Sequence, residues 1–329
     1  MILITGGSGF LGRHIVTELL EANYDLRLLI RNPEERKFPW QDLVEIFEGD
    51  VLDILALERA MEGVTHVIHA AAQVSFSKGE HEALLQTNIE GTANVVNACL
   101  LNPVERLVHI SSVSAIGKPS KKEENLITEN LAWNPALNNS KYGFSKYRAE
   151  LEVYRGIAEG LSAVMLNPAF ILGPSHDWEN GTAKIFSIID KGLRFYNEGV
   201  GGYVGVKDVA KATRLMLESD HIADGERFLM SQANLSYKEM FGMIAKALER
   251  PAPSYGVPDW LALWIGRISE LLARISGKEP IVSLETMRSG IKKHYYDGSK
   301  IEQLGFSYTP IKSVIKEAAG AYKQAKQSL

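Results

Sequence analysis

The sequence predicts an α/β fold with a doubly wound parallel sheet and a smaller, mostly helical second domain. An apolar run at 2–4 leads through a glycine-rich turn into an amphipathic segment at 11–22. Short apolar runs then alternate with amphipathic segments as far as residue 230, beyond which 236–249 and 256–276 are helical in pattern. Such alternation is typical of parallel sheets covered by helices, and its end marks a second domain.

The turn at the start of the chain has the residues of a phosphate-binding site. Gly6, Gly9 and Gly12 form the pattern G-x-x-G-x-x-G. Glycines there allow a tight turn, close approach of a pyrophosphate and close packing of the helix on the strand. The free N–H groups and the positive dipole end of the helix attract phosphate. Because a strand precedes the pattern and a helix follows it, we expect a Rossmann-type dinucleotide site.

The remaining elements are expected in alternation. The further strands are expected at 25–30, 43–47, 65–72, 106–110, 162–174, 201–206 and 226–230, and the further helices at 53–62, 80–101, 142–160, 181–192 and 208–219. Asp208 is expected to cap the last of these helices. Residues 1–169 are assigned to the dinucleotide-binding domain, to which 203–222 returns. Residues 170–200 and 226–329 are assigned to a substrate-binding domain.

The residue that ends the second strand bears on the choice of cofactor. In dinucleotide folds this position, roughly 20 residues beyond the glycines, meets the adenosine ribose. An acid there favours NAD, but this chain has Arg31, with Arg36 and Lys37 nearby. A guanidinium suits a 2′-phosphate, so the sequence favours NADP and leaves NAD open. A solvated cluster of charges is the alternative interpretation.

Composition argues against several other classes of protein. The 329 residues carry a formal net charge of −4, so a nucleic-acid partner is not expected. The single cysteine, Cys99, excludes an intramolecular disulfide. No apolar run is long enough for a spanning helix, and a strand starting at residue 2 leaves no room for a signal peptide, so a cytoplasmic protein is expected. His66 and His69 face opposite sides of a strand, so no metal site is expected.

One tyrosine and one lysine are placed to act together. Tyr142 and Lys146 lie four residues apart in an expected helix, so they share a face. The same spacing recurs where an extended segment or a turn separates the side chains, at Tyr203/Lys207 and Tyr296/Lys300. The helical pair follows the strand 106–110, whose carboxyl end carries Ser111, Ser112 and Ser114. Such strand ends hold reacting groups, although turn or cap roles explain serines equally well.

These motifs resemble those of a known superfamily. In chain order they are TGGSGFLG, Asp50, HAAA, Asn88-Ile-Glu-Gly-Thr, Ser112, Tyr142-Gly-Phe-Ser-Lys146 and Asn167-Pro-Ala-Phe-Ile-Leu-Gly-Pro174. The set resembles the extended short-chain dehydrogenase/reductase superfamily, in its NAD-dependent epimerase/dehydratase group. The strings LIRNP, NPAFILGP and YYDGSKIEQLGF make it most similar to the branch of dihydroflavonol-4-reductases and 3β-hydroxysteroid dehydrogenases.

The resemblance implies catalytic roles. Tyr142 would exchange a proton with the substrate while hydride moves to or from nicotinamide. A free phenol has a pKa near 10, and Lys146, which would also bind the nicotinamide ribose, would favour the phenolate. Ser112 would hold the substrate oxygen, because the serine of this superfamily usually lies five residues before the glycine of the loop, which here is Gly117. Asn88 would steady the helix and the site.

The resemblance also implies a set of cofactor contacts. They are Gly6, Gly9, Phe10, Leu11 and Gly12 at the pyrophosphate, Asp50 and Val51 at adenine, Lys146 at the nicotinamide ribose, and Pro168 to Phe170 at the carboxamide. Arg31 at the 2′-phosphate, the small Ala70 and Ala71, which allow close approach of the cofactor backbone, and Asn88 complete the expected cofactor-binding set.

Several reactions remain open at this level. A carbonyl reductase or alcohol dehydrogenase acting on a small or medium apolar substrate is favoured. A sugar dehydratase is disfavoured, because Val113 and Ser114 stand where an acid pair is expected. A nucleotide-sugar epimerase stays open, although 198–202 lacks the arginine that would meet a diphosphate. A non-catalytic NADP-binding sensor is a further alternative, and it would more often lack the Tyr–Lys pair.

Two segments suggest larger-scale contacts. By resemblance, 80–101 and 142–160 would pair across a homodimer. Residues 257–275 are amphipathic and rich in Trp and Leu, and we expect them to pack on the core or to line a pocket with Trp260 and Trp264. Contact with a membrane surface is the alternative for this helix.

Overall fold

The centre of the molecule is a seven-stranded parallel sheet, which confirms the expected fold class. The computed structural model describes residues 1–35, 38–74, 79, 81–119, 126–137, 140–276 and 284–327. In spatial order the strands are β11 (Arg227–Met230), β7 (Ala163–Pro168), β5 (Arg106–Ile110), β4 (His66–His69), β1 (Ile2–Thr5), β2 (Leu26–Ile30) and β3 (Glu45–Glu48). The order reverses between β4 and β1, which is where doubly wound sheets bind ligands.

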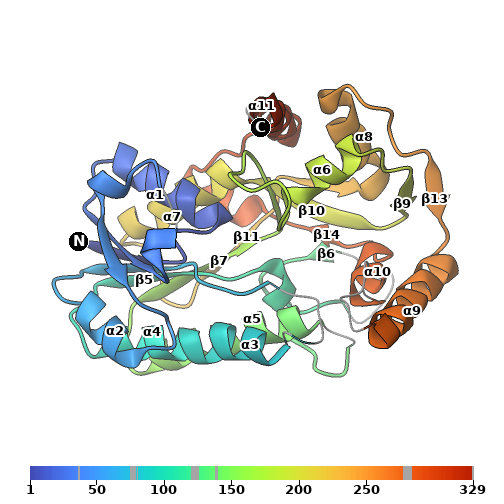
Figure 1. Cartoon of the computed structure of the whole chain (residues 1–329). Helices are drawn as coiled ribbons and strands as arrows, with labels where there is room; N and C mark the ends of the chain where they lie inside the picture. Colours follow the sequence, from blue (N-terminus) through green and yellow to red (C-terminus); the bar gives the residue numbers. More distant parts are fainter. Residues whose placement is uncertain are drawn as a thin grey trace.

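Helices cover both faces of the sheet (Figure 1). One face is covered by α1 (Phe10–Glu21) and α7 (Val206–Glu218), which pack against each other. The other is covered by α2 (Ile54–Ala60), α4 (Gly91–Leu100) and α5 (Lys141–Ala158). Helices therefore shield both faces of the sheet from water, as the continuous apolar character of these strands requires.

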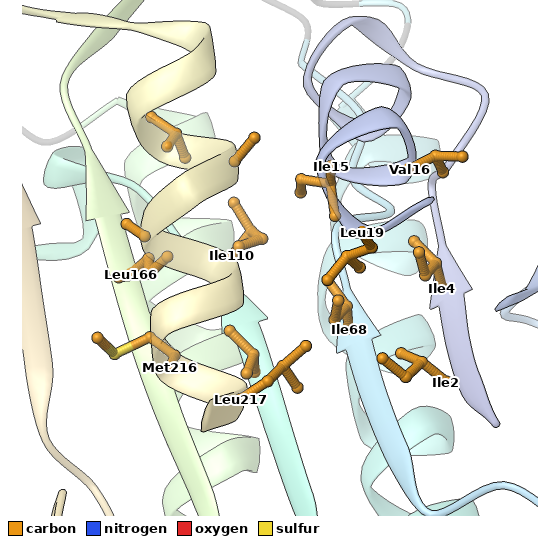
Figure 2. Close-up of a cluster of buried hydrophobic side chains, with 14 of the residues drawn as sticks. Ile2, Ile4, Ile15, Val16, Leu19, Ile68, Ile110, Leu166, Met216 and Leu217 are labelled. Carbon is orange, nitrogen blue, oxygen red and sulfur yellow. The ribbon is translucent and has the colours of Figure 1, made fainter. Parts of the chain in front are cut away.

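Alternate strand residues divide between the two faces. Ile2 and Ile4 of β1 pack with Ile15 of α1, whereas Leu3 between them belongs to the core under α2, α4 and α5. Figure 2 shows the first core, in which side chains of α1 and α7 meet those of the strands. The alternation follows from the two-residue period of a strand, which turns successive side chains to opposite faces.

A second part of the chain packs around a smaller sheet. Three strands form it: β8 (Phe170–Leu172), β10 (Val200–Gly205) and β12 (Ala233–Ser236). Its apolar core takes side chains from α6 (Lys184–Asp190), α8 (Tyr237–Leu248) and α11 (Ile311–Gln327). The remaining elements are the strand pairs β9 (Phe195–Asn197) with β13 (Tyr255–Val257) and β6 (Leu126–Ile127) with β14 (Tyr295–Tyr296), and the helices α3 (His81–Leu85), α9 (Asp259–Ser276) and α10 (Leu284–Gly290).

The structure differs from the expected elements at three points. The strand expected over 162–174 breaks at Ala169: β7 stays in the large sheet and β8 joins the small one. The segment 203–222 is likewise divided, since β10 lies in the small sheet and α7 covers the large one. β11 was expected outside the dinucleotide-binding domain, but it pairs with β7 in the large sheet.

Asp208 does not cap α7, contrary to the expectation. The helix begins two residues earlier, at Val206, with Gly205 at the N-cap position. The buried Asp208 carboxylate accepts hydrogen bonds from the backbone N–H and the hydroxyl of Thr309, at 3.0 and 2.7 Å. An acid in the first turn also interacts favourably with the helix dipole, so an aspartate just before an apolar-periodic run is compatible with the N-cap position and with the first turn.

No helix in the ranges given above has the length and apolar character needed to cross a bilayer.

Candidate active site

The glycine turn has the close contacts that its residues suggested. Gly6 has a φ of +75°, and a Cβ there would lie 2.5 Å from the backbone nitrogen of Ala71. A Cβ on Gly12 would lie 2.0 Å from the carbonyl oxygen of Gly6. Gly9 is the N-cap of α1, and neither a side-chain cap nor a first-turn acid occupies this helix start. The open N–H groups, the absent Cβ atoms and the dipole fit a bound pyrophosphate.

The other predicted cofactor residues lie along the same edge of the sheet. Arg31 follows β2 and Asp50 follows β3, and these neighbouring strand ends bring Arg31 Nη1 within 3.5 Å of Asp50 Oδ2. Ala70 and Ala71 follow β4, against the glycine turn. The remaining members along this edge are Val51 after β3, and Pro168 and Phe170 at the β7–β8 junction; the catalytic candidate Ser112 follows β5. Arg36 and Lys37 lie outside the described residues.

Tyr142, Ser112 and Lys146 come together where α5 meets the end of β5. Ser140 caps α5 by accepting a hydrogen bond from the Gly143 N–H at 2.9 Å, which fixes the first turn that carries Tyr142. The Tyr142 hydroxyl is hydrogen-bonded to the Ser112 side chain. One turn further along, Lys146 is only 2% exposed and donates from Nζ to the Ile110 carbonyl oxygen at 2.8 Å.

Burial changes the protonation behaviour of this cluster. Desolvation lowers the pKa of Lys146 to about 8, and the neighbouring Glu150 carboxylate partly offsets that shift. Burial raises the pKa of Tyr142, while its hydrogen bond to Ser112 acts in the opposite direction. Tyr142 is therefore a protonated acid at neutral pH, beside an ammonium group that titrates close to neutrality.

Asn88 links the predicted helices to the site. The helix expected over 80–101 is present from His81 to Leu100, and its middle turn, Gln86–Glu90, is a π-helical turn that carries Asn88. The buried Asn88 amide pairs with both backbone groups of Gln73 and donates to Ser145 Oγ at 2.9 Å. Ser145 Oγ in turn donates to the Tyr142 carbonyl oxygen at 2.8 Å. π-Helical turns often occur at functional sites, where the extra residue redirects a side chain.

A buried carboxylate behind the site was not anticipated. Glu150 is 1% exposed, and its Oε1 accepts from Ser111 Oγ at 2.5 Å and from Asn167 Nδ2 at 2.6 Å. Asn167 Nδ2 also donates to the Ser112 carbonyl oxygen at 3.0 Å. Arg227 Nη1 pairs with Glu150 Oε2 at 3.2 Å. The network therefore joins α5, β5, β7 and β11 directly behind Ser112.

The sequence does contain a signal for Glu150. Residues 142, 146 and 150 lie four apart, so all three share one helical stripe. A carboxylate on the stripe that turns inward needs buried partners. The partners themselves are not readable, because Asn167 and Arg227 are brought in by strands far along the chain.

A second buried polar row crosses the strand ends. His69 Nδ1 lies 2.7 Å from Thr5 Oγ1, and its Nε2 lies 2.9 Å from Thr92 Oγ1. Its ring is 5.2 Å from that of His109 on the adjacent strand. Burial lowers the pKa of His69 to about 3, so this row is neutral beside the Lys146 ammonium. His66, by contrast, is directed to Glu105 near the surface, as strand alternation predicts.

The two other Tyr–Lys pairs are separated by the fold. Tyr203 is buried in β10, whereas Lys207 lies in α7 and pairs with Glu317. Tyr296 ends β14, and Lys300, beyond a turn, pairs with Glu226. We expected the whole 203–207 segment to be extended, and this is wrong, because β10 ends at Gly205 and Lys207 lies in α7. Tyr142/Lys146 is thus the pair that shares a helix and meets a strand-end serine.

A parallel sheet that reverses its order beside a glycine-lined helix start defines a dinucleotide-binding α/β protein. Residues 2–230 match the model of the NAD dependent epimerase/dehydratase family. The chain belongs to that family, and so to the extended short-chain dehydrogenases/reductases, as its motifs implied.

Individual relatives are similar over nearly the whole chain, and a solved structure shares its fold. The chain is 30% identical over 326 residues to "Putative dihydroflavonol 4-reductase" of Synechocystis sp., which covers 96% of this chain and 92% of that protein. It is 24% identical over 338 residues to "Cinnamoyl-CoA reductase 1" of Petunia hybrida, covering 98% and 92%. The structure of a UDP-glucose 4-epimerase from Thermotoga maritima, with UDP-glucose, matches with a TM-score of 0.79 at 22% identity and covers 99% of both chains. The chain is an NAD(P)-dependent oxidoreductase of the extended short-chain dehydrogenase/reductase type.

Proposed function

We propose that the chain is a carbonyl reductase of the dihydroflavonol-reductase-like type, which acts in reverse as an alcohol dehydrogenase, on a small or medium apolar substrate. The observation that carries the proposal is the Tyr142 hydroxyl, hydrogen-bonded to Ser112 and one helical turn from the buried Lys146. Relatives named as reductases support it.

Tyr142, Ser112 and Lys146 have different roles in the proton transfer. In the reductive direction the Tyr142 hydroxyl donates its proton to the substrate oxygen, and Ser112 Oγ steadies that oxygen by a hydrogen bond. A nicotinamide cofactor held in this site would supply the hydride that the carbonyl carbon receives. The phenolate left on Tyr142 is stabilised by the Lys146 ammonium, which the Ile110 carbonyl oxygen holds in place. The neutral His69 adds no competing charge nearby.

The cofactor is held in this proposal by residues at the carboxyl edge of the sheet. Gly6, Gly9, Phe10, Leu11 and Gly12 bind the pyrophosphate at the start of α1. The other contacts are made by Asp50, Val51, Ala70, Ala71, Asn88, Lys146, Pro168 and Phe170. The tight approach of Gly6 to Ala70 and Ala71 supports this assignment, because it leaves backbone rather than side chains at the cofactor surface.

Replacing Arg31 with alanine is expected to weaken NADPH binding about tenfold or more and to change NADH binding little, since a charge-assisted contact to the 2′-phosphate would be lost. The Arg31 side chain is 67% exposed, and among the residues that the structure describes its one polar contact is the long one to Asp50 at 3.5 Å, so it can turn to a phosphate. Fluorescence titration of both cofactors gives the two affinities. Arg59→Ala, in the last turn of α2, is the matched control. An equal loss for both cofactors would remove the 2′-phosphate role.

A nucleotide-sugar epimerase is the alternative within the same superfamily. The similarity to the UDP-glucose 4-epimerase lies in the fold. Residues 198–202 carry glutamate, valine and glycines, without an arginine for a sugar diphosphate, which favours the reductase. The Tyr142/Lys146 pair likewise favours an enzyme over a non-catalytic sensor.

The reductase proposal is tested with a panel of aromatic and aliphatic aldehydes and ketones and of UDP-sugars, each incubated with the enzyme and NADPH. We expect NADPH absorbance to fall with one or more apolar carbonyl compounds. Interconversion of UDP-sugars without net loss of NADPH would establish the epimerase instead.

A homodimer through α3–α4 and α5 is part of the proposal. α5 leaves Phe144 and Leu151, which lie on one side of the helix, 38% and 40% exposed. Burying such side chains in a four-helix contact is favourable by roughly 25 cal/mol per Å² of apolar surface. Sedimentation velocity is expected to show a dimer that Leu151→Asp converts to monomer. A wild-type protein that stays monomeric would contradict this contact.

A further inference from the structure

Arg13 places a positive charge beside the glycine turn. It lies in the first turn of α1, directly after Gly12. Its side chain is half-buried, and its Nε donates a hydrogen bond to the Ser8 carbonyl oxygen at 3.1 Å. The side chain therefore folds back along the glycine turn, which keeps the guanidinium close to the helix start where the pyrophosphate is proposed to bind.

Two stacked aromatic rings fix the position of this guanidinium. Arg13 Cζ lies 4.8 Å from the centre of the Phe38 ring, which is a cation–π contact. Phe38 stacks on Trp40 with ring centroids 4.9 Å apart and an interplanar angle of 7°. Both rings are buried in the core that packs on α1. Because the guanidinium rests on a packed surface, it loses little conformational freedom when it binds a ligand.

The contact with Phe38 places Arg13 on the adenosine side of the glycine turn. Phe38 belongs to the segment after β2, which begins with Arg31. In doubly wound folds the pyrophosphate lies at the glycine turn and the adenosine ribose lies beside the end of the second strand. Arg13 contacts both of these elements, through Ser8 on one side and Phe38 on the other. The ribose hydroxyl that carries the extra phosphate of NADP would lie in the same corner.

The charges in this corner call for more than one cation. A phosphate monoester such as the 2′-phosphate carries close to two negative charges at neutral pH. The Asp50 carboxylate adds a further negative charge, and Arg31 Nη1 already lies 3.5 Å from its Oδ2. Asp50 Oδ1 accepts a hydrogen bond from the Leu52 N–H at 2.9 Å, which holds the carboxylate in place. A second guanidinium offsets this excess, and its planar donors match phosphate oxygens.

We propose that Arg13 is a second determinant of cofactor choice, whose guanidinium binds the 2′-phosphate of NADP together with Arg31. The proposal rests on the NADP preference proposed above. It adds that this preference depends on a residue of α1 as well as on the residue that ends β2.

Two nucleotides that differ only in the 2′-phosphate test the proposal, namely adenosine 2′,5′-bisphosphate and adenosine 5′-monophosphate. Their affinities for the full chain are measured by isothermal titration calorimetry, without any substrate. We expect the wild type to bind the bisphosphate more tightly. Arg13→Gln should weaken bisphosphate binding about tenfold, because a charge-assisted hydrogen bond is lost. It should change binding of the monophosphate by less than about twofold, since that ligand lacks the contact.

Two further variants separate the charge of Arg13 from its packing. Arg13→Lys keeps the positive charge but loses the planar set of donors, so its loss of bisphosphate affinity should be smaller than that of Arg13→Gln. Arg59→Gln is the matched control, because Arg59 Nε also donates to a backbone carbonyl oxygen, that of Leu55, at 3.3 Å. The control should bind both nucleotides as the wild type does. Circular dichroism checks that each variant is folded.

The outcomes distinguish this proposal from the one on which it rests. If the wild type bound both nucleotides equally, the NADP preference and the role of Arg13 would both be wrong. If the wild type preferred the bisphosphate and both Arg13 variants kept that preference, only the role of Arg13 would be overturned. An equal loss of both nucleotides in Arg13→Gln would show that Arg13 supports the glycine turn and does not contact the 2′-phosphate, which would also overturn the proposal.

Discussion

Tyr142→Phe is expected to lower kcat by about 10²- to 10⁴-fold, the range attributed to general acid–base catalysis. The substitution keeps the ring and the helix but removes the one hydroxyl that Ser112 orients toward the site. Cofactor affinity should change little, since the glycine turn and Lys146 are untouched. Steady-state turnover of an accepted carbonyl compound, together with fluorescence titration of NADPH, measures the two quantities separately.

Tyr147→Phe is the matched control for this variant. Tyr147 lies on the same helix and stacks on Trp133 with ring centroids 4.5 Å apart, a contact that phenylalanine preserves. We expect near-normal turnover in this variant. Near-normal turnover in Tyr142→Phe as well would remove Tyr142 from the chemistry.

The pH dependence of reduction should reflect Lys146. Its pKa, lowered by burial to about 8, makes the side chain an ammonium below pH 8 and neutral above it. Loss of the ammonium raises the free energy of the Tyr142 phenolate that reduction leaves behind. The reductive rate is therefore expected to fall as the pH rises through about 8. A rate that increases through this range would contradict the assigned charge of Lys146.

Glu150→Ala is expected to lower the free energy of unfolding by about 3–5 kcal/mol, the cost of removing one partner of a buried ion pair. The change leaves Arg227 without its carboxylate partner and withdraws the acceptor shared by Ser111 and Asn167. Because Asn167 also holds the Ser112 carbonyl, turnover should fall together with stability. Urea unfolding followed by circular dichroism gives the free energy.

Glu152→Ala, on the same helix, is the control for Glu150→Ala. It distinguishes the loss of the buried network from the effect that any glutamate-to-alanine change has on the helix. Glu152 pairs with Arg155 at 2.9 Å, but both side chains are partly exposed, so the pair should contribute at most about 1 kcal/mol. Equal effects of the two substitutions would show that the buried network adds nothing beyond a surface ion pair.

The fold was predictable because its signals are local. Apolar runs of strand length, amphipathic helices between them and the glycine turn each follow from neighbouring residues. Tyr142 and Lys146 could be selected from three equivalent spacings because only this pair lies on a helix just after a strand that ends in serines. The π-helical turn at Asn88 does not interrupt the 80–101 pattern, so the sequence predicted a continuous helix.

What the sequence did not predict depends on distant contacts. The break at Ala169 arises because β7 finds its partners in the large sheet and β8 finds its partner in the small one. The partner of Glu150 is supplied by β11, which places Arg227 beside it from a strand more than 70 residues further along the chain. We expected the apolar side of α9 to face a core or a pocket, but Trp260 and Trp264 are exposed. Periodicity shows that a helix has an apolar side, but it does not show whether that side faces the core or the solvent.

Transfer of label from cofactor to product tests the reductase most directly. The enzyme is incubated with an accepted carbonyl compound and NADPH that carries deuterium at the transferred position of the nicotinamide. We expect one deuterium on the new carbinol carbon for each NADPH oxidised, and almost none with Tyr142→Phe. Deuterium that stays in the cofactor pool while a UDP-sugar is converted to its epimer would contradict it.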